Sequence, residues 1–165
     1  MNIFFLDRCP IQSARQHCDK HIVKMIVEYA QMLSTTHRIL DNNNHPLLYK
    51  KAFINHPMTI WVRKSWQHYH YLFDLWTVCL CEYNNRYKKR HKAEELYKVF
   101  IKQPKNFASN IWQNPPQCMP EIYKRKNYIA GYRAFYIGEK SRFAKWKTNK
   151  IPTWYKKGLK KCMVQ

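Results

Sequence analysis

Six polar side chains recur every three or four residues between positions 17 and 35. They are His17, His21, Lys24, Glu28, Gln31 and Thr35. Because an α-helix has about 3.6 residues per turn, this spacing places them on one face of a helix. A solvated polar face is the simple alternative, but Lys24 precedes Glu28, which is the less stabilising order for an exposed ion pair. Glu28 is also one of only ten acidic residues against thirty Lys and Arg. We therefore consider a catalytic role for this face.

The chemistry available to such a face is that of an amine beside a carboxylate. An uncharged amine can attack an electrophilic carbon while the carboxylate transfers protons. An α-amino group is partly neutral at physiological pH, because its ordinary pKa is about 7.7–8.0. Two amines are candidates: the terminal amine, carried by Met1 or by Asn2 if Met1 is removed, and the side chain of Lys24. Glu28 is the expected proton carrier for either amine.

Long helices are expected to position these side chains. The apolar residues Ile22, Ile26, Tyr29 and Leu33 form a second stripe, which is typical of the buried face of an amphipathic helix. We predict helices over residues 11–40, 57–87, 93–101 and from 123 or 127 to 146, an irregular segment over 103–120, and coil over 148–165. The sequence thus predicts an all-α fold, a single compact domain over residues 1–165 built on three long helices, with a basic, aromatic C-terminal tail.

The formal net charge of +20 predicts a polyanionic partner. Nucleic acid is the expected partner, with an acidic protein or lipid head groups as alternatives. The charge is uneven, because residues 137–165 carry nine Lys or Arg and one acid. Tyr and Trp are interleaved with these cations, which suits phosphate contacts next to base stacking. The residues expected to contact DNA are Gln31, Arg142, Lys147, Trp154, Tyr155, Lys156, Lys157 and Lys160.

Other reaction classes lack the residues that they require. His70 and Asp74 provide two metal ligands without a third on the same face, and Cys79 and Cys81 point to different sides of a helix. We therefore expect no metal and no cofactor. A chain with three Gly has no nucleophile elbow and no phosphate-binding loop, so serine hydrolase, kinase and P-loop chemistry are excluded.

The sequence also predicts a compartment and an assembly state. No apolar run approaches the roughly 20 residues of a membrane span, and the apolar run at residues 4–6 is too short for a signal peptide. The six Cys are then expected to be reduced thiols rather than disulfides. We expect no membrane association, a monomer, and a reducing compartment: the cytoplasm or nucleus of a host cell, with a virion as the alternative.

Two motifs of the chain are found together in a known family. His21 precedes Glu28 by seven residues and follows Asp19-Lys20, where the family has Asp-Gln-His before its glutamate. Near the C-terminus, residues 152–156 are Pro-Thr-Trp-Tyr-Lys, and the same family has this pentapeptide at its C-terminal end. In these motifs the chain resembles the pyrimidine-dimer DNA glycosylases of the phage endonuclease V type. It also resembles uncharacterised phage proteins with a similar beginning, which implies a divergent sister branch of phage or viral proteins.

This resemblance implies an activity and roles for residues. In the family the terminal α-amine attacks the sugar C1′, and a glutamate on the first long helix, here Glu28, is its essential partner. His21 would position Glu28 or a DNA phosphate. We therefore expect a DNA N-glycosylase, with AP-lyase activity as well, that acts on damaged or modified pyrimidines in double-stranded DNA. A non-enzymatic DNA-binding or DNA-packaging protein is the alternative from another class, and an RNA-directed protein is a third.

The chain departs from the family pattern beside the glutamate and at the start. The family has arginines where this chain has Val27 and Gln31, so two phosphate or dimer contacts are missing. The family has a small second residue, whereas Asn2 is bulkier and favours retention of Met1. These departures affect the expected specificity for pyrimidine dimers more than the expected fold.

The tail has an expected mode of DNA binding. Pro152 is expected to stop the preceding helix, and Gly158 to permit a sharp turn. Trp154 and Tyr155 would then stack on DNA bases, while the lysines beside them contact phosphates. The alternative is that Trp154 anchors the tail on the core.

Overall fold

The computed structural model describes residues 1–147 and 151–162, and the regular structure in these ranges is helical. The helices are α1 (Pro10–Gln16), α2 (Asp19–Leu40), α3 (Pro57–Lys64), α4 (Trp66–Tyr87), α5 (Tyr97–Phe100), α6 (Tyr128–Lys140) and α7 (Thr153–Cys162), with 3₁₀ turns η1 (Lys92–Leu96) and η2 (Glu121–Tyr123). The prediction of an all-α fold is confirmed. The prediction of three long helices is not confirmed within the described ranges: the first two are each divided near their start, which leaves α2 and α4 as the long helices, and the third, α6, is shorter than predicted.

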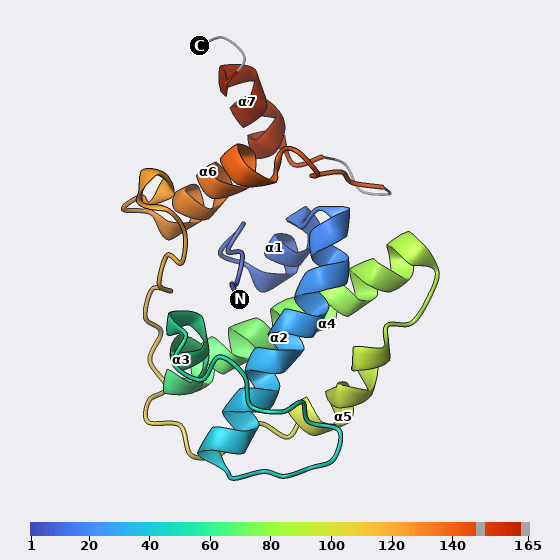
Figure 1. Ribbon diagram of the computed structural model, residues 1–165, viewed down its shortest axis with the longest axis vertical. Coiled ribbons are helices and arrows are strands. Elements are labelled where there is room, and N and C mark those ends of the chain that lie inside the picture. The colour runs from blue at the N-terminus through green and yellow to red at the C-terminus, as the bar shows by residue number, and fades with distance from the viewer. Residues whose placement is uncertain (148–150, 163–165) are drawn as a thin grey trace.

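Two crossing helices form the centre of the molecule. Figure 1 shows α2 and α4 crossing, with α3 and α5 near their lower ends and α6 and α7 in a separate upper layer. The N-terminal segment and α1 lie between that layer and the crossing (Figure 1). At the crossing, the Trp76 indole Nε1 donates a hydrogen bond of 3.1 Å to the Ile26 carbonyl. The start of the chain is therefore enclosed by helices from both halves of the sequence.

The predicted helix over residues 11–40 is divided at His17 and Cys18. Both residues have extended backbone, with ψ angles of 135° and 164°. The backbone groups that the break frees are bonded by distant residues: the Tyr136 hydroxyl accepts from the Cys18 N–H at 2.8 Å, and Arg86 donates to the His17 carbonyl at 2.8 Å. Since each freed group has a partner, the break does not leave a buried polar group unsatisfied.

Arg86 ties this break to α4. Its guanidinium is fully buried and lies 3.0 Å from the Glu82 carboxylate and 3.1 Å from the Asp19 carboxylate. It also donates to the carbonyls of Arg15 and His17. A buried cation is tolerated when charge and hydrogen bonds both compensate it, which is the case here. The Arg86 network therefore fixes the directions of α1, α2 and α4 relative to one another.

The second predicted long helix is divided at Ser65 into α3 and α4. Pro57 occupies the first turn of α3, where its missing N–H is not needed. Ser65 has extended backbone and forms an isolated bridge with Ser109, whose carbonyl accepts from the Trp66 N–H at 3.0 Å. The Ser65 side chain then accepts from the Gln67 N–H and caps α4. The segment over residues 103–120 is irregular, as predicted, and part of it stabilises this break.

The C-terminal part differs most from the prediction. The predicted helix to residue 146 ends at Lys140, and the predicted coil contains a helix, α7, that follows Pro152. Gly158 does not form a turn; it allows close packing, since a Cβ there would lie 2.2 Å from the Ile137 Cδ1. The tail is helical because it packs on an apolar surface of the protein. That surface cannot be predicted from the sequence of the tail alone.

Two further findings concern membrane-spanning helices and the state of the cysteines. No helix among the described residues has the length and apolarity that crossing a membrane requires. The cysteines at positions 9, 18, 79, 81 and 118 are free thiols; two of them, Cys18 and Cys79, are buried, while Cys9 and Cys81 are exposed.

Candidate active site

The start of the chain is held in place by its own side chains. Phe4 is buried and stacks on His21, with ring centroids 4.4 Å apart. The Asn2 amide donates to the Cys118 carbonyl at 2.8 Å, and its oxygen accepts from the Tyr132 hydroxyl at 3.1 Å. The Met1 side chain is also buried, and its sulfur accepts from the Thr59 hydroxyl. The terminal amine is therefore fixed by contacts with both halves of the chain.

Three nitrogen atoms lie around the Glu28 carboxylate. The carboxylate lies 4.0 Å from the Met1 amine, 3.3 Å from the Asn2 backbone nitrogen and 3.2 Å from the Lys24 Nζ. The Glu28 side chain is 20% exposed, whereas that of Lys24 is 69% exposed. The terminal amine would lie beside Glu28 whether Met1 or Asn2 carried it. The structure thus brings together four of the residues that the sequence singled out.

A cavity of about 450 Å³ opens in front of this carboxylate. Its walls combine cations with aromatic rings and come from the N-terminal segment, α2, α6 and the segment after α6. The lining residues are Met1, Asn2, Phe4, Lys20, His21, Lys24, Met25, Glu28, Phe135, Lys140, Arg142 and Phe143. Burial lowers the pKa of Lys140 from its ordinary value, because desolvation disfavours the ammonium form. Rings and cations around one carboxylate suit a ligand with both a base and phosphates.

His21 is a buried residue in the wall of this cavity. Burial, together with the positive charges of Lys140 and Lys24, lowers its pKa to about 2, so the imidazole is neutral. Its Nδ1 is buried and has no hydrogen-bond partner. A neutral imidazole still has one N–H donor and one acceptor, so the expectation that His21 positions Glu28 or a DNA phosphate stays a prediction. His21 lies in the cavity wall, between the rings of Phe4 and Phe143.

The row of polar residues on α2 is shorter than predicted. His17 lies before the helix break, and its ring is buried between the Ser13 carbonyl and the Tyr29 hydroxyl, at 2.7 and 2.8 Å. Thr35 is buried as well, and its hydroxyl accepts from the Ala52 N–H at 3.3 Å. The prediction that the six residues share one face of one helix is therefore wrong for His17, and tertiary packing covers Thr35 at the other end.

Two residues that were predicted to contact DNA also make contacts within the protein. The Gln31 amide donates to the Lys50 carbonyl at 3.1 Å, which attaches the loop after α2 to that helix. The Lys147 N–H donates to the Asp19 carboxylate at 3.1 Å, and its ammonium lies 5.7 Å from the Tyr87 ring centre. The side chain of Lys147 remains exposed, whereas the amide of Gln31 is engaged.

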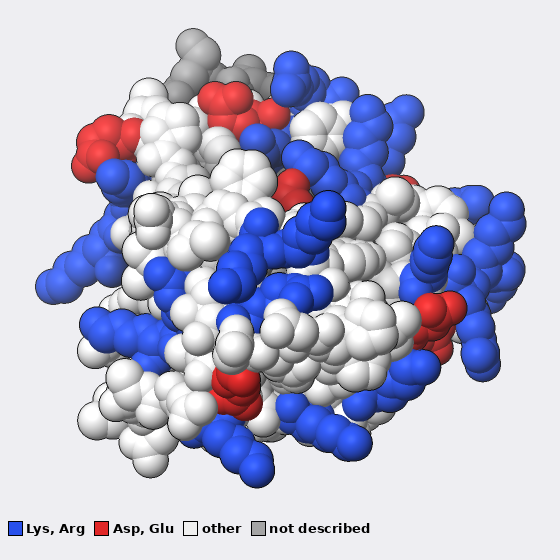
Figure 2. All heavy atoms as spheres, turned by 60° about the horizontal axis from the view of Figure 1, so that its bottom comes forward, with Lys and Arg blue, Asp and Glu red and all other residues white. Residues whose placement is uncertain are grey.

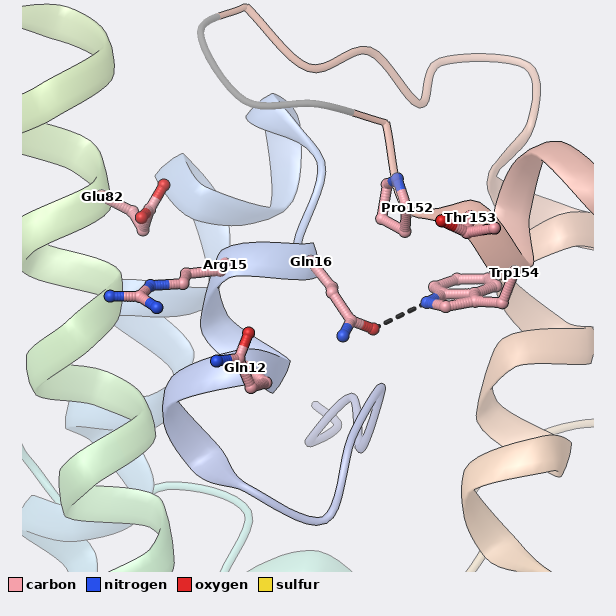
Figure 3. A pocket seen from close by; sticks show the side chains of 7 residues that line it. All are labelled: Gln12, Arg15, Gln16, Glu82, Pro152, Thr153 and Trp154. Atoms are coloured by element: carbon pink, nitrogen blue, oxygen red, sulfur yellow. Dashed lines mark hydrogen bonds between the residues drawn. The ribbon is translucent and has the colours of Figure 1, made fainter.

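The aromatic pair of the tail packs inward. Tyr155 is buried against Tyr136 and Trp146, so it has no free face for a base and the expectation of stacking is corrected. Trp154 is half-buried; its indole Nε1 donates to the Gln16 Oε1 at 2.6 Å, and Arg133 lies 5.2 Å above its ring. Figure 3 shows this hydrogen bond between Gln16 and Trp154, with the Arg15 side chain pointing the other way; all three residues line a second cavity, of about 490 Å³. Trp154 thus anchors the tail on the protein, as in the alternative to base stacking that the sequence analysis gave.

The lysines of α7 remain available to a polyanion. Lys156, Lys157 and Lys160 are exposed, as is Arg142 beside the first cavity. Figure 2 shows that Lys and Arg are spread over much of the face in view, while Asp and Glu form only isolated patches on it. Charge of one sign over a large area favours association with a polyanion over a broad contact surface.

Some residues of the site were not identified from the sequence. Phe135, Phe143 and Lys140 line the cavity, yet they lie more than a hundred residues after Glu28 and carry no motif. The sequence signal that could have found them is the alternation of aromatic and basic residues over 135–147. The described residues contain no group of three His, Cys, Asp or Glu side chains that could hold a metal ion.

Comparison with known proteins yields no relative. No model of a protein family matches the chain, and neither a curated protein nor a solved structure matches it.

Proposed function

We propose that this protein is a DNA base-excision enzyme, an N-glycosylase with AP-lyase activity on damaged or modified pyrimidines. The observation that carries the proposal is the terminal amine 4.0 Å from the Glu28 carboxylate, at a cavity lined by cations and aromatic rings. An amine and a carboxylate at this separation can exchange protons after a small movement. The charge of +20 supports a nucleic acid substrate.

The mechanism assigns one role to each group. The terminal amine, in its neutral form, attacks C1′ while the C1′–N bond to the base breaks and its electron pair leaves with the base, which takes up a proton. Glu28 accepts the proton that the amine loses and passes it to the sugar oxygen O4′ as the C1′–O4′ bond breaks, which gives a protonated imine between the amine and C1′ and leaves Glu28 ionised again. Glu28 then removes a C2′ proton, and the electrons expel the 3′ phosphate. Lys140 and Arg142 would hold the flanking phosphates.

Borohydride trapping tests the amine mechanism directly. Borohydride reduces an imine to a stable amine, so an active protein becomes covalently attached to a duplex that contains an abasic site. Intact mass of the purified protein shows whether Met1 or Asn2 carries the terminal amine. A variant extended by Gly-Ser before Met1 should lose trapping, whereas Lys24→Ala should keep it. Loss in the Lys24→Ala variant alone would move the nucleophile to Lys24, and no adduct with any abasic, dimer or modified-base duplex would refute the mechanism.

A non-enzymatic DNA-binding protein is the second candidate. It is favoured by the ion pair between Lys24 and Glu28 at 3.2 Å, which gives Glu28 a structural partner. This candidate predicts tight, strongly salt-dependent binding that does not distinguish intact duplexes from lesion-bearing ones. Binding constants for both duplexes, with structured RNA as a competitor, separate it from the enzyme and from an RNA-directed protein.

A further inference from the structure

One aromatic residue near the site is both strained and exposed. Phe53 belongs to the loop between α2 and α3, its side chain is 64% exposed, and its φ angle is +49°. Positive φ is unfavourable for a residue with a Cβ, and an exposed ring has no packing to compensate it. Strained backbone that a fold retains is concentrated at functional positions. A structural role does not account for Phe53.

The loop holds Phe53 in this position from both sides. Before it, the Lys50 carbonyl accepts from the Gln31 amide, and the Ala52 N–H donates to the Thr35 hydroxyl. After it, the Phe53 carbonyl accepts from the His56 N–H at 3.0 Å. The next carbonyl, that of Ile54, accepts from the Arg63 guanidinium at 2.6 Å. The exposed ring therefore extends from a backbone that is attached to α2 and α3.

These attachments place the loop beside the candidate site. Gln31 lies one helical turn after Glu28 on α2. His56, which closes the turn with Phe53, is close enough to the terminal amine and to Glu28 for both charges to act on its ring. The α3 residue Thr59 contacts the Met1 sulfur. The loop and the cavity thus share the same part of α2 and the same N-terminal residue.

The surroundings of Phe53 indicate what it contacts. Lys50 and Lys51 are exposed on the same loop, and Ile54, the next residue, presents further apolar surface. A second copy of this chain would bring like charges together, given the net charge of +20. A DNA duplex offers phosphates to the lysines and stacked bases to the ring. Proteins that bend DNA insert apolar side chains, Phe among them, between base steps.

We propose that Phe53 is a wedge that inserts between base pairs of a DNA duplex, beside the nucleotide presented to Glu28. The inference rests on the proposed function and adds to it the means of reaching a base inside a duplex. A base must leave the stack before its C1′ can be attacked, and an inserted ring replaces the lost stacking. Lys50 and Lys51 contact the phosphates on either side of the opened step.

The test compares wedge variants on duplex and single-stranded DNA. Phe53→Gly removes the ring and relieves the positive φ, so this variant should fold, and Phe53→Trp should restore the wedge. Ile111→Ala is the matched control, because Ile111 is 66% exposed but lies beside the break between α3 and α4. In a duplex with 2-aminopurine next to an abasic site, wild type and Phe53→Trp should raise the fluorescence and Phe53→Gly should not. Borohydride trapping of Phe53→Gly on the duplex should fall roughly tenfold relative to wild type, which is the scale of one lost stacking contact. On an abasic single strand, where no stack must be opened, trapping of this variant should stay within about twofold of wild type.

The outcomes separate the wedge from the chemistry. If Phe53→Gly matches wild type in fluorescence and in duplex trapping, the wedge is refuted while the amine mechanism stands. If neither wild type nor any variant is trapped on the duplex or on the single strand, the amine mechanism fails, and the fluorescence comparison still decides the wedge. A dimer in sedimentation that Phe53→Gly converts to a monomer would assign the ring to self-association instead. An equal loss of binding to single-stranded RNA and to duplex DNA would assign it to general stacking, which also refutes the wedge.

Discussion

The molecule has two groups of carboxylates and cations on its crossing helices, one around Arg86 of α4 and one around Glu28 of α2. The two groups differ in how completely their charged atoms are buried and hydrogen-bonded. Around Arg86, the guanidinium is fully buried and bonded to two carboxylates and two carbonyls. Around Glu28, the carboxylate is 20% exposed, and its distance to the terminal amine is 4.0 Å. One group is closed, and the other opens into a cavity.

The difference shows how one helix can serve both structure and chemistry. Full satisfaction makes the Arg86 network rigid, since any movement would leave a buried charge without a partner. The Glu28 carboxylate is partly exposed at the cavity, so it can exchange protons with a ligand. In the same cavity wall, the buried His21 Nδ1 has no hydrogen-bond partner. Unsatisfied polar atoms in an otherwise well-bonded protein are a reason to assign function to that region.

The largest expected effect comes from breaking the closed group. Arg86→Met leaves Glu82 and Asp19 without their shared cation and should lower the free energy of unfolding by about 3–5 kcal/mol. Urea unfolding followed by circular dichroism measures this loss. The matched control is Arg90→Met, an exposed arginine after α4, which should change stability by less than about 0.5 kcal/mol. A loss below about 1 kcal/mol for Arg86→Met would contradict the assignment.

The open group should respond in activity instead of stability. Glu28→Gln keeps size and hydrogen bonding but removes the proton acceptor, so base release should fall by roughly 10²-fold or more. DNA affinity should stay the same or improve, because a negative charge leaves a phosphate-binding surface. Glu95→Gln, at an exposed position in η1, is the matched control for charge. Wild-type turnover by Glu28→Gln on the true substrate would end its catalytic assignment, and failure to fold would make Glu28 structural.

The buried histidines predict how stability depends on pH. Burial lowers the pKa of His17 and His37 to about 4 and, with nearby positive charges, that of His21 to about 2, against an ordinary value of 6.5. As the pH falls below 6.5, the unfolded chain therefore binds protons that the folded chain rejects. The free energy of unfolding should fall from pH 6.5 to about 4, by up to about 1.4 kcal/mol per pH unit for each histidine. Urea unfolding at pH 7, 6 and 5 measures the slope, and His21→Phe should reduce it. A flat profile would contradict the burial of these rings.

The smallest expected effect concerns the lysines of α7. Changing Lys156 and Lys157 together to Ala should weaken binding to every duplex alike and lower the slope of log K against log salt by about two. Lys88 and Lys89, two adjacent exposed lysines after α4, provide a control pair of equal charge. The measurement is a salt series of binding constants on intact and lesion duplexes. If the α7 pair leaves the slope unchanged, that helix does not lie on DNA.

The sequence by itself determined the local features of the chain. The helical period of residues 19–33 predicted α2 and its buried stripe, and Pro57 marked the start of α3. These signals are local, because a helix forms from bonds and contacts between residues three and four apart. The same period singled out Glu28 and Lys24, which the structure places 3.2 Å apart.

Only the tertiary structure decided where helices break and which polar residues are covered. The break at Cys18 depends on Tyr136, more than a hundred residues away, and the burial of Tyr155 depends on Tyr136 and Trp146. A pattern along the chain cannot contain such contacts, because they form between segments that are distant in sequence. The backbone strain at Phe53 also could not be predicted from the sequence, because a positive φ at a residue with a side chain persists only where the surrounding fold imposes it.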